Sequence, residues 1–136
     1  MIIIGEKING SIPIVAEAIA KRDSEFIKAR AKLQAESGAT YIDCCASVPE
    51  AEEVETLKWM IDCIQEVTDL PISIDSPSPD VLAQAYKFCK IAMILSKTFR
   101  RSAAHFGIPV LSLSSAITCH PSFPGSAMIG KIVSIL

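Results

Sequence analysis

Residues 71–75 read Pro-Ile-Ser-Ile-Asp, a short run rich in isoleucine that ends in a carboxylate. Two earlier runs have the same design, because residues 2–6 read Ile-Ile-Ile-Gly-Glu and residues 40–45 read Thr-Tyr-Ile-Asp-Cys-Cys. Short apolar runs of this kind are typical of strands that are buried on both faces of a parallel sheet. The sequence therefore predicts three such strands, each of which brings an acidic side chain to its end or close to it.

Helical patterns fill the intervals between these runs. They cover residues 14–20, a segment from Asp23 or Ser24 to Gly38, a segment that begins at Pro49, and residues 80–88. Asp23 or Ser24 can cap the second helix, and Gly38 can end it in the left-handed conformation. A further apolar run at residues 89–95 predicts a fourth strand. Strands and helices that alternate with short links predict an α/β fold with a parallel sheet covered by helices.

Polar side chains lie where each predicted strand gives way to its loop. Glu6 and Asn9 follow the first strand. Asp43 belongs to the second strand and Asp75 ends the third. The carboxyl ends of parallel strands meet at one rim, and ligands bind there in α/β folds. A single aspartate is usually a helix cap, as Asp75 would be for the helix after Pro77, but three carboxylates in register favour a site.

Three motifs together resemble the pterin-binding family. Residues 3–10 read Ile-Ile-Gly-Glu-Lys-Ile-Asn-Gly, residues 41–47 read Tyr-Ile-Asp-Cys-Cys-Ala-Ser, and residues 72–76 read Ile-Ser-Ile-Asp-Ser. More narrowly, they are similar to the methyltetrahydrofolate:corrinoid methyltransferases, and dihydropteroate synthase is a more distant relative on the same fold. The resemblance covers residues 1 to about 94.

This resemblance implies a fold, a reaction and a partner. The fold would be a partial TIM (β/α)8 barrel of about four to five βα units with parallel strands. The enzyme would move a methyl group between methyltetrahydrofolate, which becomes tetrahydrofolate, and the cobalt of a corrinoid carried by a partner protein. It would hold no tightly bound metal of its own.

The resemblance also implies which residues bind the pterin ring. Asp75 would accept hydrogen bonds from the amino and ring N–H groups, because a carboxylate offers two acceptor oxygens in one plane. Asp43, Asn9 and Glu6 would line the same rim, with Asp43 the more direct contact. No residue of this chain is assigned a catalytic role at this stage.

The sequence departs from the family pattern after residue 94. Leu95 stands where the family has an asparagine that contacts the pterin near N5, and the later site residues have no counterpart before Leu136. Residues 1–96 hold nine basic and fifteen acidic side chains, whereas residues 97–136 hold four basic and no acidic ones. We therefore expect residues 1–96 to be the N-terminal half of a pterin-binding barrel, and residues 97–136 to be an atypical tail that results from a frameshift or a truncation.

Two alternatives to an active methyltransferase follow from these departures. One is a catalytically inactive fragment that binds pterin or is purely structural. The other is an enzyme similar to dihydropteroate synthase. Half a barrel would also leave two open sheet edges, which predicts that two copies pair as a homodimer.

Length, charge and composition argue against several other classes of protein. A length of 136 residues fits one domain, and a net charge of −2 argues against binding to nucleic acid or to anionic lipid. We expect a cytoplasmic location, because no apolar run is long enough to span a membrane and the opening run is too short for a signal peptide. The five cysteines lack metal-site or disulfide spacing, which predicts reduced thiols. The only histidines, His105 and His120, have no placed partner.

Overall fold

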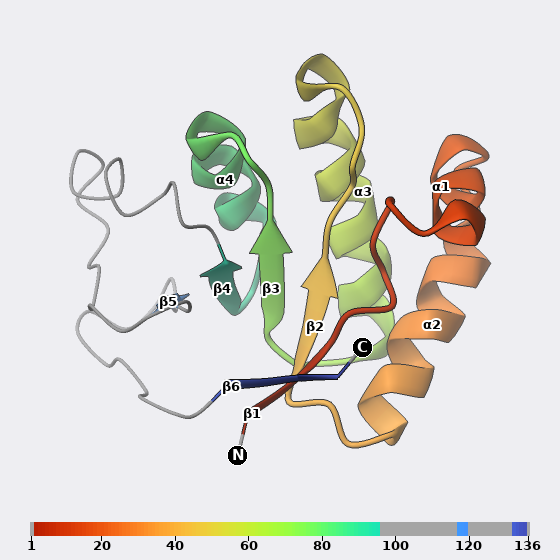
Figure 1. Ribbon diagram of the computed structural model, residues 1–136, viewed down its shortest axis with the longest axis vertical. Coiled ribbons are helices and arrows are strands. Elements are labelled where there is room, and N and C mark those ends of the chain that lie inside the picture. Colours follow the sequence, from red (N-terminus) through yellow and green to blue (C-terminus); the bar gives the residue numbers. More distant parts are fainter. Residues whose placement is uncertain (1, 96–116, 120–131, 136) are drawn as a thin grey trace.

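The computed structural model describes residues 2–95, 117–119 and 132–135. The elements in chain order are β1 (Ile2–Gly5), α1 (Pro13–Ala20), α2 (Ser24–Glu36), β2 (Tyr41–Cys44), α3 (Glu50–Val67), β3 (Ile72–Asp75), α4 (Pro79–Ala85), the 3-10 turn η1 (Tyr86–Phe88), β4 (Ala92–Leu95), β5 (Ile117–Cys119) and β6 (Ile132–Ile135) (Figure 1). The helices and strands predicted up to residue 95 are all present, so the α/β class is confirmed.

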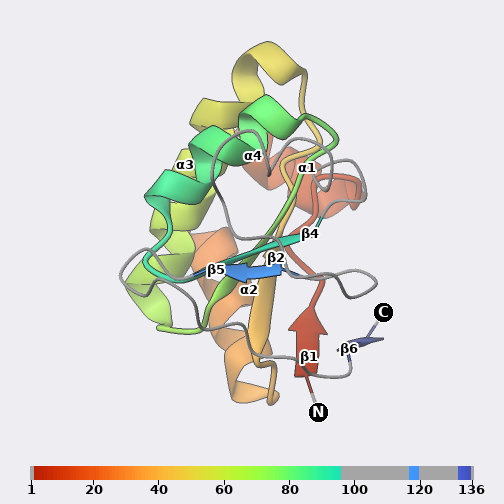
Figure 2. The ribbon, with the colours of Figure 1, turned by 90° about the vertical axis from the view of Figure 1, so that its left-hand side faces the viewer.

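The strands form one six-stranded sheet in the order β5-β4-β3-β2-β1-β6. From β1 to β4 each strand pairs in parallel with the next strand of the chain. Because βα crossovers are right-handed, stepping in one direction across the sheet puts every connecting helix on the same face. Figures 1 and 2 show α2, α3 and α4 gathered on that one face. The loops that follow β1, β2 and β3 leave the sheet together at its carboxyl end, at the top of Figure 1.

The C-terminal part of the sheet departs from the prediction of parallel strands. The sequence Ile-Thr-Cys-His-Pro of residues 117–121 predicts a turn, but residues 117–119 form β5, which pairs antiparallel with β4. The sheet is therefore not wholly parallel. The unpaired N–H and C=O groups at the edge of β4 accept a strand of either direction, so local turn signals do not decide the outcome. β6 pairs in parallel with β1, so both edges of the β1–β4 sheet are occupied within the chain.

The alternation of side chains divides the sheet into two faces. Ile42, Cys44, Ile72 and Ile74 are fully or almost fully buried and belong to the core under the helices. The intervening positions of β2 and β3 lie on the opposite face, since successive strand residues point to opposite sides. The registers Asp43↔Ser73 and Ile42↔Ile72 confirm that neighbouring strands keep the same division.

An apolar stripe of α3 packs on the helix-covered face of the sheet. Leu57, Met60, Ile61 and Ile64 of this helix are fully buried. Their spacing of three and four residues places them on one side of the helix. Most of the core therefore lies between the sheet and its helices.

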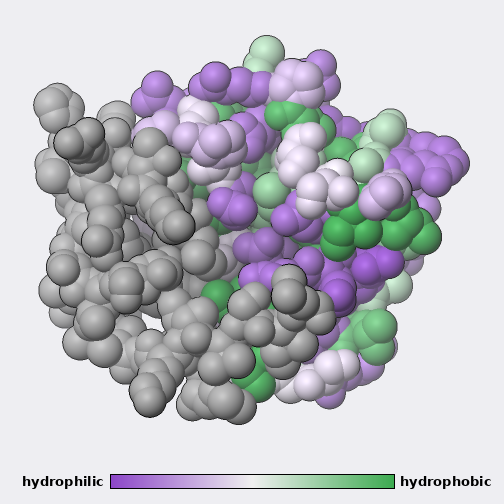
Figure 3. Space-filling view, viewed as in Figure 1, coloured by the Kyte–Doolittle hydropathy of each residue, from purple (hydrophilic) through white to green (hydrophobic). Residues whose placement is uncertain are grey.

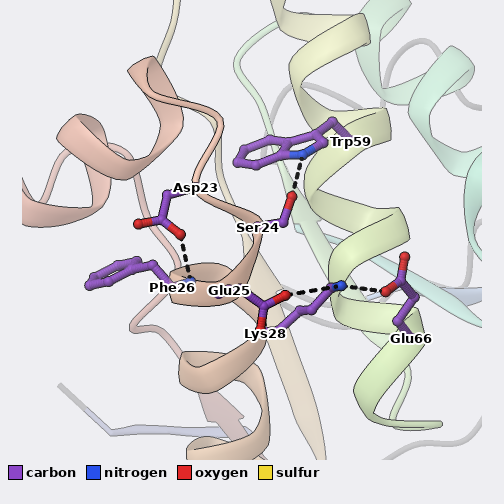
Figure 4. A network of polar contacts seen from close by, with 7 residues as sticks. All are labelled: Asp23, Ser24, Glu25, Phe26, Lys28, Trp59 and Glu66. Atoms are coloured by element: carbon purple, nitrogen blue, oxygen red, sulfur yellow. Dashed lines mark hydrogen bonds and ion pairs between the residues drawn. The ribbon is translucent and has the colours of Figure 1, made fainter.

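Local signals set the ends of α2 as the sequence predicts. Asp23 caps the helix, because its Oδ1 accepts a hydrogen bond from the Phe26 N–H at 3.0 Å (Figure 4). Gly38 follows the helix with φ +93°, a backbone conformation that residues with a Cβ rarely adopt. The chain can therefore turn from α2 directly into β2.

Polar contacts join α2 to α3 (Figure 4). The Trp59 Nε1–H donates to Ser24 Oγ at 3.1 Å. Lys28 Nζ lies 2.5 Å from a Glu66 oxygen and 3.5 Å from a Glu25 oxygen. Trp59 is thus a helix-packing residue.

Hydrophilic side chains prevail on the described surface in Figure 3, with apolar side chains gathered on the side of α1 and α2. Ile14 of α1 is 51% exposed and Leu33 of α2 is 64% exposed. None of the described helices is long and apolar enough to span a membrane. Three further features lie outside the described residues: the two histidines, the basic pair Arg100–Arg101, and the apolar run at residues 108–113, whose pattern is consistent with a further strand.

Candidate functional site

The structure brings three predicted carboxyl groups together at the carboxyl end of the sheet. Asp43 lies in β2 and is only 6% exposed, while Asp75 ends β3 and is half-buried. Both lie on the face opposite the helices, because Asp43 is in register with Ser73 and Asp75 is two residues further along the same strand. Glu6 directly follows β1, the neighbouring strand of β2, and is also half-buried.

Burial and the repulsion of nearby negative charges perturb Asp43 and Asp75. Burial raises the pKa of Asp43 to about 7, and the negative charges of Asp75 and Glu6 add to this rise. Burial also raises the pKa of Asp75, with a further contribution from Glu6. Such perturbation by desolvation and like charge is typical of functional sites. The role of these residues as ligand contacts stays a prediction.

Asn9 has a structural function in the loop after β1. Its Oδ1 accepts hydrogen bonds from Ser11 N at 2.9 Å and from Ser11 Oγ at 2.7 Å. Its backbone forms a parallel bridge with Cys45, which extends the pairing of β1 and β2 toward the rim. Gly10 is required beside it, because a Cβ there would lie 2.0 Å from the carbonyl oxygen of Ala46. The structure therefore places Asn9 at the rim as a turn former, and its contact with a ligand stays a prediction.

Two side chains of helix α2 form hydrogen bonds with the backbone of the loop that follows β1. Gln34 Oε1 accepts a hydrogen bond from Lys7 N at 2.8 Å, and Arg30 Nη1 donates to Lys7 O at 3.3 Å. Gly5 leaves room for this contact, since a Cβ there would lie 2.6 Å from Gln34 Oε1. These contacts fix the backbone of Lys7, directly after Glu6. Sequence reasoning missed the role of Gln34, whose only signal is a polar side chain on a mostly apolar helix stripe.

The alternative role of Asp75 as a helix cap is wrong. Ser78 caps α4, with its Oγ accepting from Val81 N at 3.5 Å. The Ser78 hydroxyl also donates to Glu50 Oε1 at 2.6 Å, and Ser78 N donates to Ser76 Oγ at 3.2 Å. The capping function is thus supplied three residues after Asp75, and the Asp75 carboxyl group is not needed for it.

Glu53 is a buried carboxyl group that sequence reasoning did not single out. It is 3% exposed and lies in the first turns of α3. Burial raises its pKa, the charges of Glu50 and Asp75 add to the rise, and a hydrogen bond with Ser76 opposes it. Glu53 therefore contacts the loop that follows Asp75 from the helix side. Several glutamates stand together at the start of α3, a pattern typical of an exposed first turn of a helix. The sequence therefore gives no sign that Glu53 is buried.

Ser73 is the second polar residue that the sequence analysis passed over. It is fully buried in β3, next to Asp43 in the strand register. Its hydroxyl counters part of the rise in the pKa of Asp43. This contact with the Asp43 carboxyl group falls outside strict hydrogen-bond geometry, and Ser73 Oγ has no other hydrogen-bond partner among the described residues.

Thiols near the site are neutral. Burial raises the pKa of both Cys44 and Cys45. Cys45 Sγ lies 3.3 Å from Ser47 Oγ at the rim. The four cysteines in the described part of the chain whose side chains are placed are unpaired: Cys44, Cys45, Cys63 and Cys89. Among the described residues, no group of three or more His, Cys, Asp or Glu side chains is arranged to hold a metal ion.

Comparison with known proteins now adds to this geometry. Over 90 residues the chain is 53% identical to the methylcorrinoid:tetrahydrofolate methyltransferase of Eubacterium limosum. This homologue is a methyltransferase. The alignment covers 66% of this chain and 33% of the homologue, so the chain spans about a third of the length of that curated relative. No family model matches the chain. The homologue supports the resemblance to tetrahydrofolate- and corrinoid-dependent methyltransferases that the three motifs indicate.

Proposed function

We propose that this chain forms the pterin-binding part of a methyltransferase that moves a methyl group between methyltetrahydrofolate and a protein-bound corrinoid. The observation that carries the proposal is the cluster of Asp43, Asp75 and Glu6 at the carboxyl ends of adjacent strands, on the face without helices. Supporting it, the homologue bears the name of an enzyme with this pair of substrates.

The fold proposed for residues 1–96 is the first half of a TIM barrel. Strands β1 to β4 follow one another in the sheet without a reversal, with their helices on one face. A doubly wound fold would reverse direction and place helices on both faces. In barrels the ligand site is at the carboxyl ends of the strands, where the three carboxyl groups are found.

The chemistry of the cluster suits a flat heterocycle that is rich in N–H groups. An ionised Asp75 can accept two parallel hydrogen bonds from the amino and ring N–H groups of a pterin. Such bonds would also relieve the repulsion between Asp75 and Glu6. The Asp75 carboxylate at the carboxyl end of β3 would then recognise the edge of the pterin ring through these hydrogen bonds.

Asp43 is suited to a proton-handling role in the same site. With a pKa of about 7 it is present both as carboxylic acid and as carboxylate near neutral pH, so it can donate or accept a hydrogen bond. A group poised in this way can hold or release a proton beside an amine whose bonding changes during transfer. The corrinoid of the partner protein would supply the cobalt that gives or takes the methyl group.

An inactive pterin-binding fragment is the second candidate. Leu95 is in register with Asp75, at the position where the family has an asparagine. The chain also spans only about a third of its homologue. Nothing comparable favours an enzyme similar to dihydropteroate synthase. The pairing of two copies also stays a prediction. The argument for it from open sheet edges is weaker, because β5 and β6 cover the edges of the β1–β4 sheet.

The test combines a binding measurement with an activity measurement on the full chain. Calorimetric titration with tetrahydrofolate detects binding, and spectroscopy of cob(I)alamin with methyltetrahydrofolate detects methyl transfer. Binding with transfer supports the methyltransferase, and binding without transfer supports the inactive module. The absence of tetrahydrofolate binding would refute both candidates.

A further inference from the structure

Two serine–glutamate pairs join the loop after β3 to the first turn of α3. Ser78 Oγ accepts a hydrogen bond from Val81 N at 3.5 Å and donates to Glu50 Oε1 at 2.6 Å. Ser76 Oγ accepts from Ser78 N at 3.2 Å, and its side chain forms a hydrogen bond with Glu53. A serine hydroxyl has one proton and an ionised carboxylate only accepts, so Ser76 is the donor to Glu53. Each serine thus links a backbone amide of the loop or of α4 to a glutamate of α3.

The pair of Ser76 and Glu53 differs from the other pair because it is buried. Glu53 is 3% exposed and Ser76 is 2% exposed, whereas Glu50 is exposed. A buried carboxyl group costs stability, and an apolar side chain of similar size would avoid this cost. The positive end of the helix dipole offsets only part of it, since Glu53 lies in the first turn of α3. A carboxyl group that is retained here therefore indicates a constraint other than packing.

Ser76 directly follows Asp75, and its side chain points to the other side of the sheet. Asp75 belongs to the face opposite the helices, and side chains alternate along an extended chain, so the next side chain points toward the helices. The contact of Ser76 with Glu53 of α3 agrees with this direction. The backbone before Asp75 is held by the pairing of β3 with β2 and β4. The hold on Ser76 supplies the support on the loop side.

We propose that Glu53 is a positioning residue for Asp75, which holds the loop after β3 through Ser76 so that the Asp75 carboxylate faces the amino and ring N–H groups of a pterin. The inference rests on the proposed function, because it needs a heterocycle at Asp75. Two parallel hydrogen bonds require a carboxylate in one defined orientation, and such an orientation depends on the residues that support it. Glu53 acts from the helix side of the sheet and does not contact the ligand.

The experiment compares Glu53→Ala with Glu53→Gln and with the matched variant Glu55→Ala in the full chain. Glu55 lies on the same helix and is exposed. Hydrogen exchange followed by NMR reports on the Ser78 amide in the free protein, and calorimetric titration with tetrahydrofolate gives Kd. We expect Glu53→Ala to speed the exchange of the Ser78 amide about tenfold and to weaken Kd about tenfold, because it removes a hydrogen bond to a charged group.

The two other variants should resemble the wild type in both measurements. Glutamine keeps an acceptor oxygen for the Ser76 hydroxyl, so Glu53→Gln should hold the exchange rate and Kd within about threefold of the wild-type values. Glu55→Ala removes an equal charge from the same helix at an exposed position. Ser76→Ala removes the same hydrogen bond from the loop side and should weaken Kd as Glu53→Ala does. It carries the test if Glu53→Ala does not fold.

Each other outcome overturns the inference. An unchanged Kd in Glu53→Ala, with or without faster exchange at Ser78, leaves Glu53 a purely structural role. Equal losses in Glu53→Ala and Glu53→Gln trace the effect to charge instead of the hydrogen bond, and faster exchange throughout the sheet traces it to a general loss of stability. If the unmodified chain does not bind tetrahydrofolate, the proposed function fails together with this inference, whereas binding that is insensitive to Glu53→Ala removes this inference alone.

Discussion

Replacing Asp43 by asparagine should make the free protein more stable at alkaline pH. Asp43 is buried beside two other carboxyl groups, and its pKa rises from 3.8 to about 7 on folding. The folded state therefore keeps a proton that the unfolded chain releases, and the folded state binds more protons between these two values. Stability then falls as the pH rises through this interval, because the group must be ionised in an unfavourable place.

The size of the effect follows from the shift. One pKa unit corresponds to about 1.4 kcal/mol, so a rise of about three units costs about 4 kcal/mol once the pH exceeds the folded pKa. Asparagine has the shape of the protonated acid and carries no charge, so it removes this cost. The gain in the variant should be close to zero near pH 4 and should grow until about pH 7.

Urea unfolding followed by far-ultraviolet circular dichroism measures the gain at a series of pH values. The difference between variant and wild type isolates Asp43 from the other titrating groups, since these are common to both proteins. Asp69→Asn is the matched control for the loss of one carboxyl group, because Asp69 is exposed in the loop before β3, at the other end of that strand from Asp75. A variant that is less stable than wild type at pH 8, or a difference that does not depend on pH, would refute the reasoning.

Two further predictions concern the ligand and the packing behind the site. Asp75→Asn should weaken tetrahydrofolate binding by about 1–3 kcal/mol, because an amide offers one acceptor where the carboxylate offers two; calorimetry checks this, and Asp69→Asn should bind as the wild type does. An equal loss in both variants would point to net charge instead of a specific contact. Gly5→Ala should lower the free energy of unfolding by about 1–3 kcal/mol, because the new Cβ would lie 2.6 Å from Gln34 Oε1. Urea unfolding should show part of this loss recovered in Gly5→Ala combined with Gln34→Ala, and a fully additive loss would contradict the steric cause.

The sequence was sufficient for the elements up to residue 95 because their signals are local. The apolar spacing of α3, the Asp23 cap and the glycine after α2 each act within one or two turns of chain. The meeting of Asp43 and Asp75 was also predictable, since strand alternation and parallel order together place carboxyl ends at one rim.

The remaining features depend on contacts between segments that are distant in the chain. Gln34 meets the β1 loop across 27 residues, and Glu53 meets Ser76 across the α3–β3 connection. The sequence shows that such a polar side chain lies within an apolar pattern. Its hydrogen-bond partner can be identified only once the packing of the helices on the strands is known. The antiparallel strand β5 belongs to the same class, because the edge strand β4 beside it in the sheet determines its pairing.

The location of the one tryptophan has a practical consequence for all these measurements. Trp59 lies between α2 and α3, with the Arg22 guanidinium 5.0 Å from its ring centre, on the opposite side of the sheet from Asp43 and Asp75. In the ligand-free protein its emission therefore reports on the packing of α2 against α3. An unchanged emission spectrum of a ligand-free variant shows that this helical layer is kept, which favours the site itself as the origin of an altered affinity.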